Sequence, residues 1–169
     1  MTETVYIGLG SNLGDRERFL DRTVALLRQV EGLEVIAVSS IYAGPAQGMA
    51  PDTPGFLNQV IKADYSFTPT ELLDNLERIE GELGRESKGK RLPRTIDIDI
   101  LLFGNRQVKT DRLEIPHARL TGRSFVLVPL LEIEPDLTHP LTGKPLSKYV
   151  TPDCQTQIEI YRHHVARQV

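Results

Sequence analysis

The segment TIDIDILLF, residues 95–103, alternates acidic or polar side chains with apolar ones before it becomes wholly apolar. Successive side chains of a β-strand point to opposite faces of a sheet. Asp97 and Asp99 therefore share one face, and the isoleucines around them share the other. The pattern predicts a strand that packs one face on a core and presents two carboxylates on the other.

The segments before this strand predict the element order β-α-β-β-α-β. Strands are expected over 5–9, 33–42 and 56–65, and helices over 15–30 and 68–83. This order is typical of the ferredoxin-like arrangement, an α+β fold in which an antiparallel sheet carries helices on one face. The other face would be open for a site.

Three further segments complete the predicted organisation. Residues 8–14 (GLGSNLG) have neither the Gly-Lys-Ser/Thr of a P-loop nor the GxGxxG spacing, so we expect a tight structural turn there. Residues after 103 predict a further strand or hairpin and a helical C-terminal third, and 151–169 a polar tail. No repeat or linker divides the chain, so we expect a single domain over 1–169.

Composition narrows the class of protein. The chain has 169 residues, 40% of them hydrophobic and 25% charged, which is an ordinary globular mixture. Its net charge of −3 argues against a general nucleic-acid binder. Cys154 is the single cysteine, and the sequence shows no signal-peptide pattern and no apolar run long enough for a membrane span. We expect a protein of the reducing cytoplasm that binds neither nucleic acid nor membranes.

The two carboxylates carry the sharpest chemical signal. Same-face strand residues two apart lie about 7 Å from each other, and two charges there repel by about 2 kcal/mol at an effective dielectric constant of 20. That face needs water, cations or a bound metal, and Mg²⁺ often joins a carboxylate pair to substrate phosphates. On alternation alone, an amphipathic strand with a hydrated face is the favoured alternative.

A basic segment directly before the strand favours a functional interpretation of the two carboxylates over a merely hydrated strand face. Residues 84–94 (GRESKGKRLPR) contain five basic residues and one acidic residue. Arg and Lys bind phosphate oxygens, and metal ligands beside such cations are the two halves of a nucleotide triphosphate site. Residues 43–55, with three Gly and three Pro, predict a functional loop or lid.

The segment 93–101 (PRTIDIDIL) resembles the signature of the 6-hydroxymethyl-7,8-dihydropterin pyrophosphokinase family of folate biosynthesis. The resemblance extends in order over residues 5–146. Its other matching segments are 8–14, 56–58, 78–80, 84–85, 115–117 and 123–130. It implies the ferredoxin-like fold and a diphosphokinase activity, in which ATP donates a pyrophosphoryl group to the pterin hydroxymethyl oxygen and leaves AMP.

The resemblance also implies roles for single residues. Those matched to catalysis are Asp97 and Asp99, as ligands of two Mg²⁺ ions, with Arg85 and Arg94. Those matched to ATP are Glu80, Lys88, Arg94, Ile100, Arg112, His117 and Arg123. Those matched to the pterin are Gly44, Pro45, Phe56, Asn58 and Phe125, the two Phe stacking on the flat heterocycle and the Asn bonding its edge. Without the resemblance, the Phe pair is interpretable as core, and Glu80, Arg112, His117 and Arg123 as structural or surface residues.

The chain departs from the family pattern in its loops. Gly44 replaces a usual threonine, Gln47 a usual apolar residue, and Ala118 a usual polar or aromatic one, while Leu92 stands where Trp-Gly often precedes Pro-Arg. These departures concern loop behaviour and the details of pterin contact. They leave the carboxylate pair and most phosphate ligands unchanged.

Three alternatives stay open. An ordinary kinase acting on a small alcohol would release ADP rather than AMP, and a non-catalytic pterin- or nucleotide-binding module would bind without turnover. An RNA-binding ferredoxin-like sheet needs exposed aromatic residues, which make up only 6% of this chain. We expect ATP and the pterin as the partners, and a monomer or weak homodimer.

Overall fold

The computed structural model describes residues 2–44, 55–84, 95–152 and 158–163. Its main sheet is antiparallel at every recorded pairing and has the strand order β5-β1-β4-β3-β8, with β2 also pairing with β4. The strands are β1 (Glu3–Ser11), β2 (Leu33–Val38), β3 (Ile41–Gly44), β4 (Phe56–Tyr65), β5 (Asp97–Phe103) and β8 (Glu159–Arg162). A separate hairpin joins β6 (Val108–Lys109) to β7 (Glu114–Ile115).

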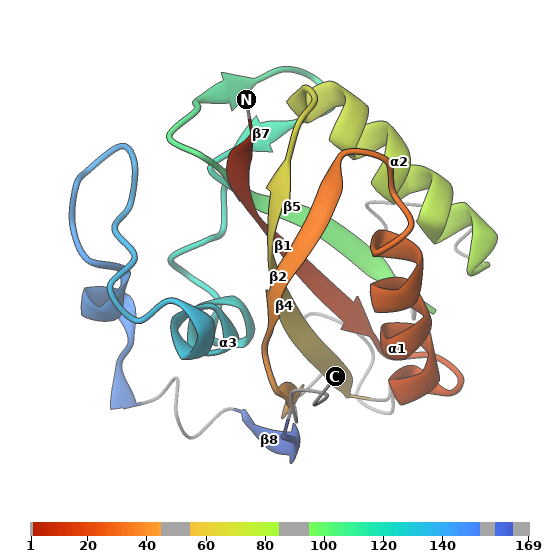
Figure 1. Ribbon diagram of the computed structural model, residues 1–169. Helices are drawn as coiled ribbons and strands as arrows, with labels where there is room; N and C mark the ends of the chain where they lie inside the picture. Colours follow the sequence, from red (N-terminus) through yellow and green to blue (C-terminus); the bar gives the residue numbers. More distant parts are fainter. Residues whose placement is uncertain (1, 45–54, 85–94, 153–157, 164–169) are drawn as a thin grey trace.

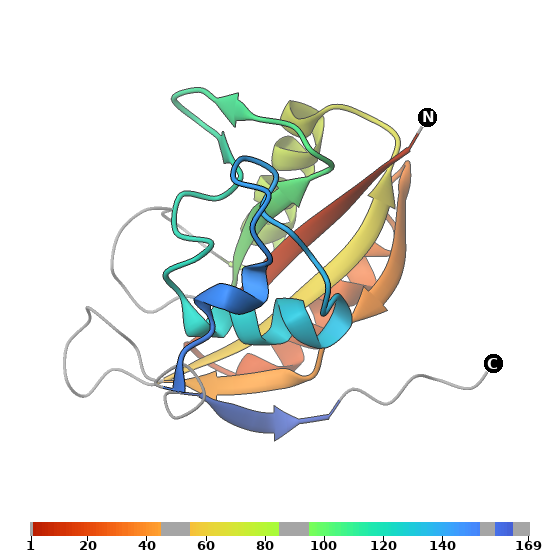
Figure 2. The same ribbon diagram turned by 90° about the vertical axis from the view of Figure 1, so that its left-hand side faces the viewer.

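Helices lie on both faces of the sheet (Figure 1). Helices α1 (Arg16–Leu27) and α2 (Pro69–Glu82) lie on one face, and α3 (Ser124–Ile133) lies on the opposite face. The turned view in Figure 2 shows α3 beside the short 3-10 helix η1 (Leu146–Tyr149). We call the first face the helical face and the second the α3 face.

The alternation of β1 explains both layers. Val5, Ile7 and Leu9 are buried in the core of the helical face. Tyr6, between them, belongs to the smaller core under α3. Each strand thus supplies one set of side chains to each layer, as the strand period requires.

The α+β class is confirmed, and the helices and strands follow one another through β5 as predicted, except that one expected strand is divided in two. The expectation that helices occupy one face holds for α1 and α2 but is wrong for α3. Tyr6, Val60 and Leu101 make part of the opposite face apolar, and α3 buries Leu127 and Leu130 there. Burial of that patch is the physical reason why the second face is covered along part of its length.

Side chains cap the first turns of α1 and α2. The Asp15 carboxylate accepts a hydrogen bond from the Arg18 backbone N–H at 3.2 Å, and the Thr68 hydroxyl accepts one from the Glu71 N–H at 3.2 Å. Gly84 follows α2 with a φ of +92°, a conformation that favours glycine and ends the helix. None of the helices in the described residues has the length and apolar character needed to cross a bilayer.

The segment predicted as one strand over 33–42 is two strands, β2 and β3, that pair with consecutive parts of β4. The interruption falls at Ser39 and Ser40. Ser39 still bonds Val60 through its N–H, at 2.9 Å. The Ser40 N–H instead donates to the Glu132 carboxylate of α3, at 3.0 Å. A helix side chain therefore takes the place of a strand partner.

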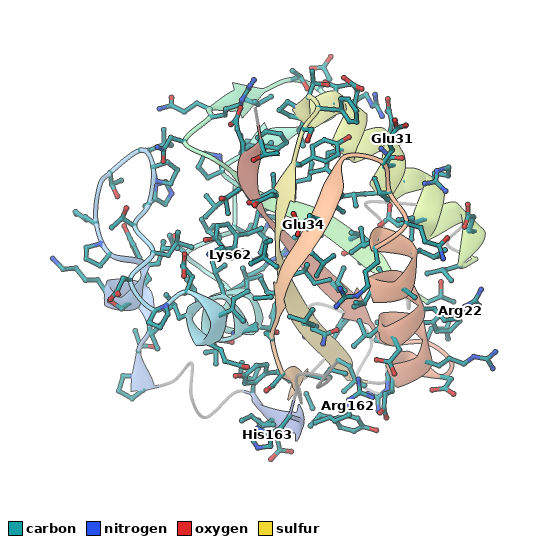
Figure 3. All side chains as sticks on the ribbon, in the orientation of Figure 1. Arg22, Glu31, Glu34, Lys62, Arg162 and His163 are labelled. Carbon is teal, nitrogen blue, oxygen red and sulfur yellow. The ribbon has the colours of Figure 1, made fainter. Side chains whose placement is uncertain are left out.

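The interpretation of 151–169 as a polar tail is wrong for residues 159–162. These form β8, which pairs with β3 at the sheet edge. The Arg162 guanidinium binds the Asp21 carboxylate at 2.6 Å and also the Glu17 carboxylate, both on α1. Figure 3 shows Arg162 between β8 and α1. Strand pairing and these ion pairs attach the segment to the fold.

Candidate active site

The two predicted metal ligands lie on β5 as the alternation requires. Asp97 and Asp99 are partly exposed, whereas Ile98 and Ile100 are buried in the core of the helical face. The prediction that the carboxylates share the face opposite this core is confirmed. That face is the α3 face.

Glycines lie directly across from the carboxylates. On β1, Gly10 pairs with Asp97 and Gly8 pairs with Asp99. Gly10 also pairs with Asn58 of β4 on its other side. Residues opposite each other in a sheet point to the same face, so Asp97, Gly10 and Asn58 form one row across three strands.

The prediction of a tight turn over 8–14 is wrong for its first half, because β1 continues to Ser11. The glycines serve the strand rather than a turn. A Cβ on Gly10 would lie 3.0 Å from Asn58 Oδ1 and 3.4 Å from Phe56 Cδ1, and one on Gly8 would lie 3.3 Å from Leu101 Cδ2. The missing side chain of Gly10 lets Asn58 and Phe56 close over the middle of the row.

Glu80 holds the carboxylate strand in place. Its side chain is 4% exposed, and its carboxylate accepts a hydrogen bond from the Ile98 backbone N–H at 2.9 Å. Since Ile98 lies between the two aspartates, this bond fixes the edge strand β5 to α2 at the candidate metal site. The alternative interpretation of Glu80 as helix surface is thereby excluded.

His117 lies beside β5, the strand that carries the two carboxylates. Its backbone N–H donates to the Leu101 carbonyl at 3.0 Å, and its Nδ1 accepts from the Arg119 backbone N–H at 3.1 Å. Burial lowers the pKa of His117, and although Asp99 and Asp97 favour its charged form, Arg123 adds to the lowering. A neutral ring whose Nδ1 accepts carries its proton on Nε2, where it can donate to an anionic oxygen.

The residues matched to the pterin come from three elements. Asn58 is 5% exposed, Phe56 is partly exposed on the same side of β4, and Gly44 of β3 pairs with Phe56. Phe125, in the first turn of α3, packs on the core under that helix. The Arg123 guanidinium carbon lies 5.3 Å from the Phe125 ring centroid, so a cation lies beside the ring.

Two predicted ATP ligands lie apart from this arrangement. The exposed Arg112 guanidinium binds Asp74 at 2.9 Å and Glu77 at 3.1 Å, both on the outside of α2. The Ile100 side chain is buried on the helical face, so it can meet a nucleotide only through its main chain. The remaining matched residues, Pro45, Arg85, Lys88 and Arg94, lie outside the described residues, as does Gln47.

The oxygen ligands of the site suit a hard cation that also binds water or substrate oxygens. Within the described ranges, no group of three or more His, Cys, Asp or Glu side chains could hold a metal ion. Two carboxylates alone leave most coordination positions to water or substrate. Mg²⁺ is bound in that way, through one or two carboxylates and substrate phosphates.

Two features beside the site are not indicated by the sequence pattern. The glycine-rich composition predicts a turn at Gly8 and Gly10, although their spacing of two is the strand period and matches the spacing of Asp97 and Asp99. Tyr42 and Glu132, whose side chains meet at 2.6 Å, are 90 positions apart. No local pattern links such a pair.

Comparison with known proteins gives one family. The model of the family described as 7,8-dihydro-6-hydroxymethylpterin-pyrophosphokinase (HPPK) matches residues 6–135. The chain is 43% identical over 146 residues to the 2-amino-4-hydroxy-6-hydroxymethyldihydropteridine pyrophosphokinase of Aquifex aeolicus, covering 86% of this chain and 89% of that protein. It is 46% identical over 133 residues to the Bacillus subtilis protein of the same name, covering 79% of each.

Solved structures agree in fold. A crystal structure of Plasmodium falciparum HPPK-DHPS A437G with pteroate matches with a TM-score of 0.70 at 14% identity, over 95% of this chain and 46% of that chain. This chain thus spans about half the length of that solved chain. At such low identity, the likeness shows the fold alone.

Proposed function

The chain belongs to the 7,8-dihydro-6-hydroxymethylpterin-pyrophosphokinase family, and we propose that it transfers the pyrophosphoryl group of ATP to the hydroxymethyl oxygen of 6-hydroxymethyl-7,8-dihydropterin, with release of AMP. One observation carries the proposal. The row Asp97, Gly10, Asn58 connects two kinds of group. At one end, Asp97 belongs to a carboxylate pair suited to a metal–phosphate complex, and at the other end Asn58 is a buried amide suited to a pterin edge. The two substrates would therefore meet across β1.

The carboxylate end of the row binds the polyphosphate. Asp97 and Asp99 would hold two Mg²⁺ ions, which when bound neutralise phosphate charge and draw electron density from the transferred group. Glu80 keeps β5 in position through its bond to the Ile98 N–H. Neutral His117 donates from Nε2 to a phosphate oxygen, and Arg123 supplies a positive charge at the start of α3.

The basic segment before β5 completes the phosphate site in this proposal. Arg85, Lys88 and Arg94 bind the moving phosphates, as the family resemblance implies, and Ile100 and Arg112 contact the nucleoside. For Arg112, this requires release from Asp74 and Glu77. Both ion pairs are exposed and screened by solvent, so the release costs little.

The amide end of the row binds the pterin. The Asn58 side chain can donate and accept at once, which matches the paired donors and acceptors on a pterin edge. Phe56 from β4 and Phe125 from α3 stack on the ring, and Gly44 and Pro45 contact the pterin, as the family resemblance implies. Stacked aromatic rings add about 0.5–1.5 kcal/mol beyond the burial of their area.

No side chain of the described residues stands out as a general base for the hydroxymethyl group. Phosphoryl transfer needs little covalent help, so alignment of the attacking oxygen with the phosphorus supplies most of the rate. We place the reaction in the reducing cytoplasm, with the protein as a monomer or weak homodimer and without a nucleic-acid partner.

The decisive experiment incubates the purified protein with ATP, Mg²⁺ and 6-hydroxymethyl-7,8-dihydropterin and separates the nucleotides by chromatography. We expect AMP and the pterin diphosphate in equal amounts, and no product after addition of a chelator. Formation of ADP would indicate an ordinary kinase instead. Pterin binding without turnover would indicate a binding module.

A further inference from the structure

One carboxylate outside the row connects α3 to β3 through buried donors. Glu132, in the last turn of α3, accepts hydrogen bonds from the Ser40 N–H at 3.0 Å, the Ser40 hydroxyl at 3.1 Å and the Tyr42 hydroxyl at 2.6 Å. Ser40 and Tyr42 are 4% and 6% exposed. Three donors from one short stretch of chain thus meet one carboxylate.

These bonds are strong for their kind. Hydrogen bonds to an ionised acceptor are shorter and about twice as strong as neutral ones. Burial, reinforced by the Glu132 charge, raises the pKa of Tyr42, so its phenol stays protonated and donates. The Ser40 N–H has left the strand ladder to make this contact, since β2 and β3 are interrupted at this point.

Both ends of the connection lead to residues of the proposed pterin site. On the strand side, Tyr42 pairs with Asn58, and Gly44 at the end of β3 pairs with Phe56. On the helix side, Phe125 precedes Glu132 by seven residues, which is about two helical turns and brings both to the same side of the helix. The same helix therefore carries a stacking ring at one end and the anchor of β3 at the other.

A second carboxylate in the same helix end provides a natural comparison. Glu134 accepts from the Tyr6 hydroxyl and from Lys62 Nζ, each at 3.1 Å. Tyr6 and Lys62 pair with each other on β1 and β4, four positions along each strand from Gly10 and Asn58. Figure 3 shows Lys62 on the side of the sheet toward α3. Glu134 ties the helix to the sheet without touching β3.

We propose that Glu132 is a positioning residue that sets the placement of β3 against α3, and thereby the placement of Gly44, Phe56 and Asn58 relative to Phe125. This inference rests on the proposed function for its substrate. Glu132 itself does not touch the pterin. It acts through Ser40 and Tyr42, and its loss alters pterin binding while the carboxylate end of the row, on β5, stays as it is.

The test compares Glu132→Gln with Glu134→Gln, and Tyr42→Phe with Tyr6→Phe. Calorimetric titration with 6-hydroxymethylpterin, and separately with Mg²⁺ and a non-hydrolysable ATP analogue, gives both affinities. We expect Glu132→Gln to weaken pterin binding about tenfold and Tyr42→Phe about threefold, with ATP-analogue affinity within about twofold of wild type. The two control variants keep pterin affinity within about twofold even where they lower Tm as much.

Equal loss of pterin affinity in Glu132→Gln and Glu134→Gln would assign both a merely structural role and overturn the proposal, as would no loss in either. If Glu132→Gln does not fold, Tyr42→Phe against Tyr6→Phe decides alone. The proposed function fails separately. A wild type that binds the pterin but releases no AMP refutes the transfer reaction, and the titrations still test the positioning role.

Discussion

The two faces of the sheet are made from the same strands but have different roles: one packs the core under α1 and α2, and the other carries the candidate site. On the helical face, β1 contributes Val5, Ile7 and Leu9, all buried, and their contacts hold α1 and α2. On the α3 face, the same strand contributes Gly8 and Gly10, across from carboxylates. Strand alternation lets stability and chemistry change almost independently at neighbouring positions, and substitutions on either face test that separation.

The largest effect is expected from the carboxylates. Asp97→Asn or Asp99→Asn removes a metal ligand without changing size, so AMP release should fall by about 10³-fold or more. The free energy of unfolding should stay within about 1 kcal/mol of wild type, because both side chains are partly exposed. Initial rates at saturating Mg²⁺ and denaturant melts give the two quantities. Near-normal turnover in either variant would remove the metal assignment.

Substitution of Ile98, between the two aspartates, should lower stability rather than activity. Ile98 is fully buried on the helical face, so Ile98→Ala leaves a cavity and should cost about 2–4 kcal/mol of stability. Activity per folded molecule should stay within about threefold of wild type below the melting transition, since the Ile98 N–H still binds Glu80. A variant that is stable but inactive would show that the two faces are not separable here.

A smaller effect on binding is expected at the centre of the row. Gly10→Ala adds a Cβ that would lie 3.0 Å from Asn58 Oδ1, so that Asn58 must move, and pterin affinity should fall about tenfold. The matched variant is Gly81→Ala in α2, where an added Cβ meets nothing within 4 Å. It should raise stability by about 0.5–1 kcal/mol and leave binding unchanged. Equal pterin affinity in both variants would contradict the close approach at Gly10.

The contrast between the faces also explains what the sequence could predict. Alternation around Asp97 and Asp99 follows from local periodicity and is confirmed, as is the sequence of helices and strands apart from the break within 33–42. The caps at Asp15 and Thr68 likewise depend on local hydrogen bonds. The family resemblance placed Asn58 at the pterin, and the structure adds that it shares a row with Asp97.

The rest depends on contacts between distant segments. The segment at Gly8 and Gly10, predicted as a turn, is a strand, and its glycines lie against distant residues: Gly10 against Asn58 and Phe56, and Gly8 against Leu101. The break between β2 and β3 depends on Glu132, and β8 on pairing with β3 at the sheet edge. Local propensity depends only on neighbouring residues and takes no account of these distant contacts. It therefore favours the wrong local structure in these segments.

The smallest expected effect is a pH dependence of stability that originates at His117. Burial lowers its pKa below the ordinary value of 6.5, so the unfolded chain takes up a proton at a higher pH than the folded chain does. The free energy of unfolding contributed by this group is therefore constant above pH 6.5 and decreases as the pH falls from there toward the lowered pKa. Denaturant melts in chelator between pH 8 and pH 5 measure it, and His117→Gln should remove this component.

The aspartates set the extent of that pH window. Asp99 and Asp97 favour protonated His117 and so limit the lowering of its pKa. Asp99→Asn removes part of this opposition, so the His117 pKa should fall further and the loss of stability should continue to lower pH than in wild type. NMR titration of the His117 ring gives the pKa directly in both proteins. A pKa unchanged by Asp99→Asn would show that the carboxylate and the imidazole do not share one electrostatic environment, and would separate His117 from the phosphate site.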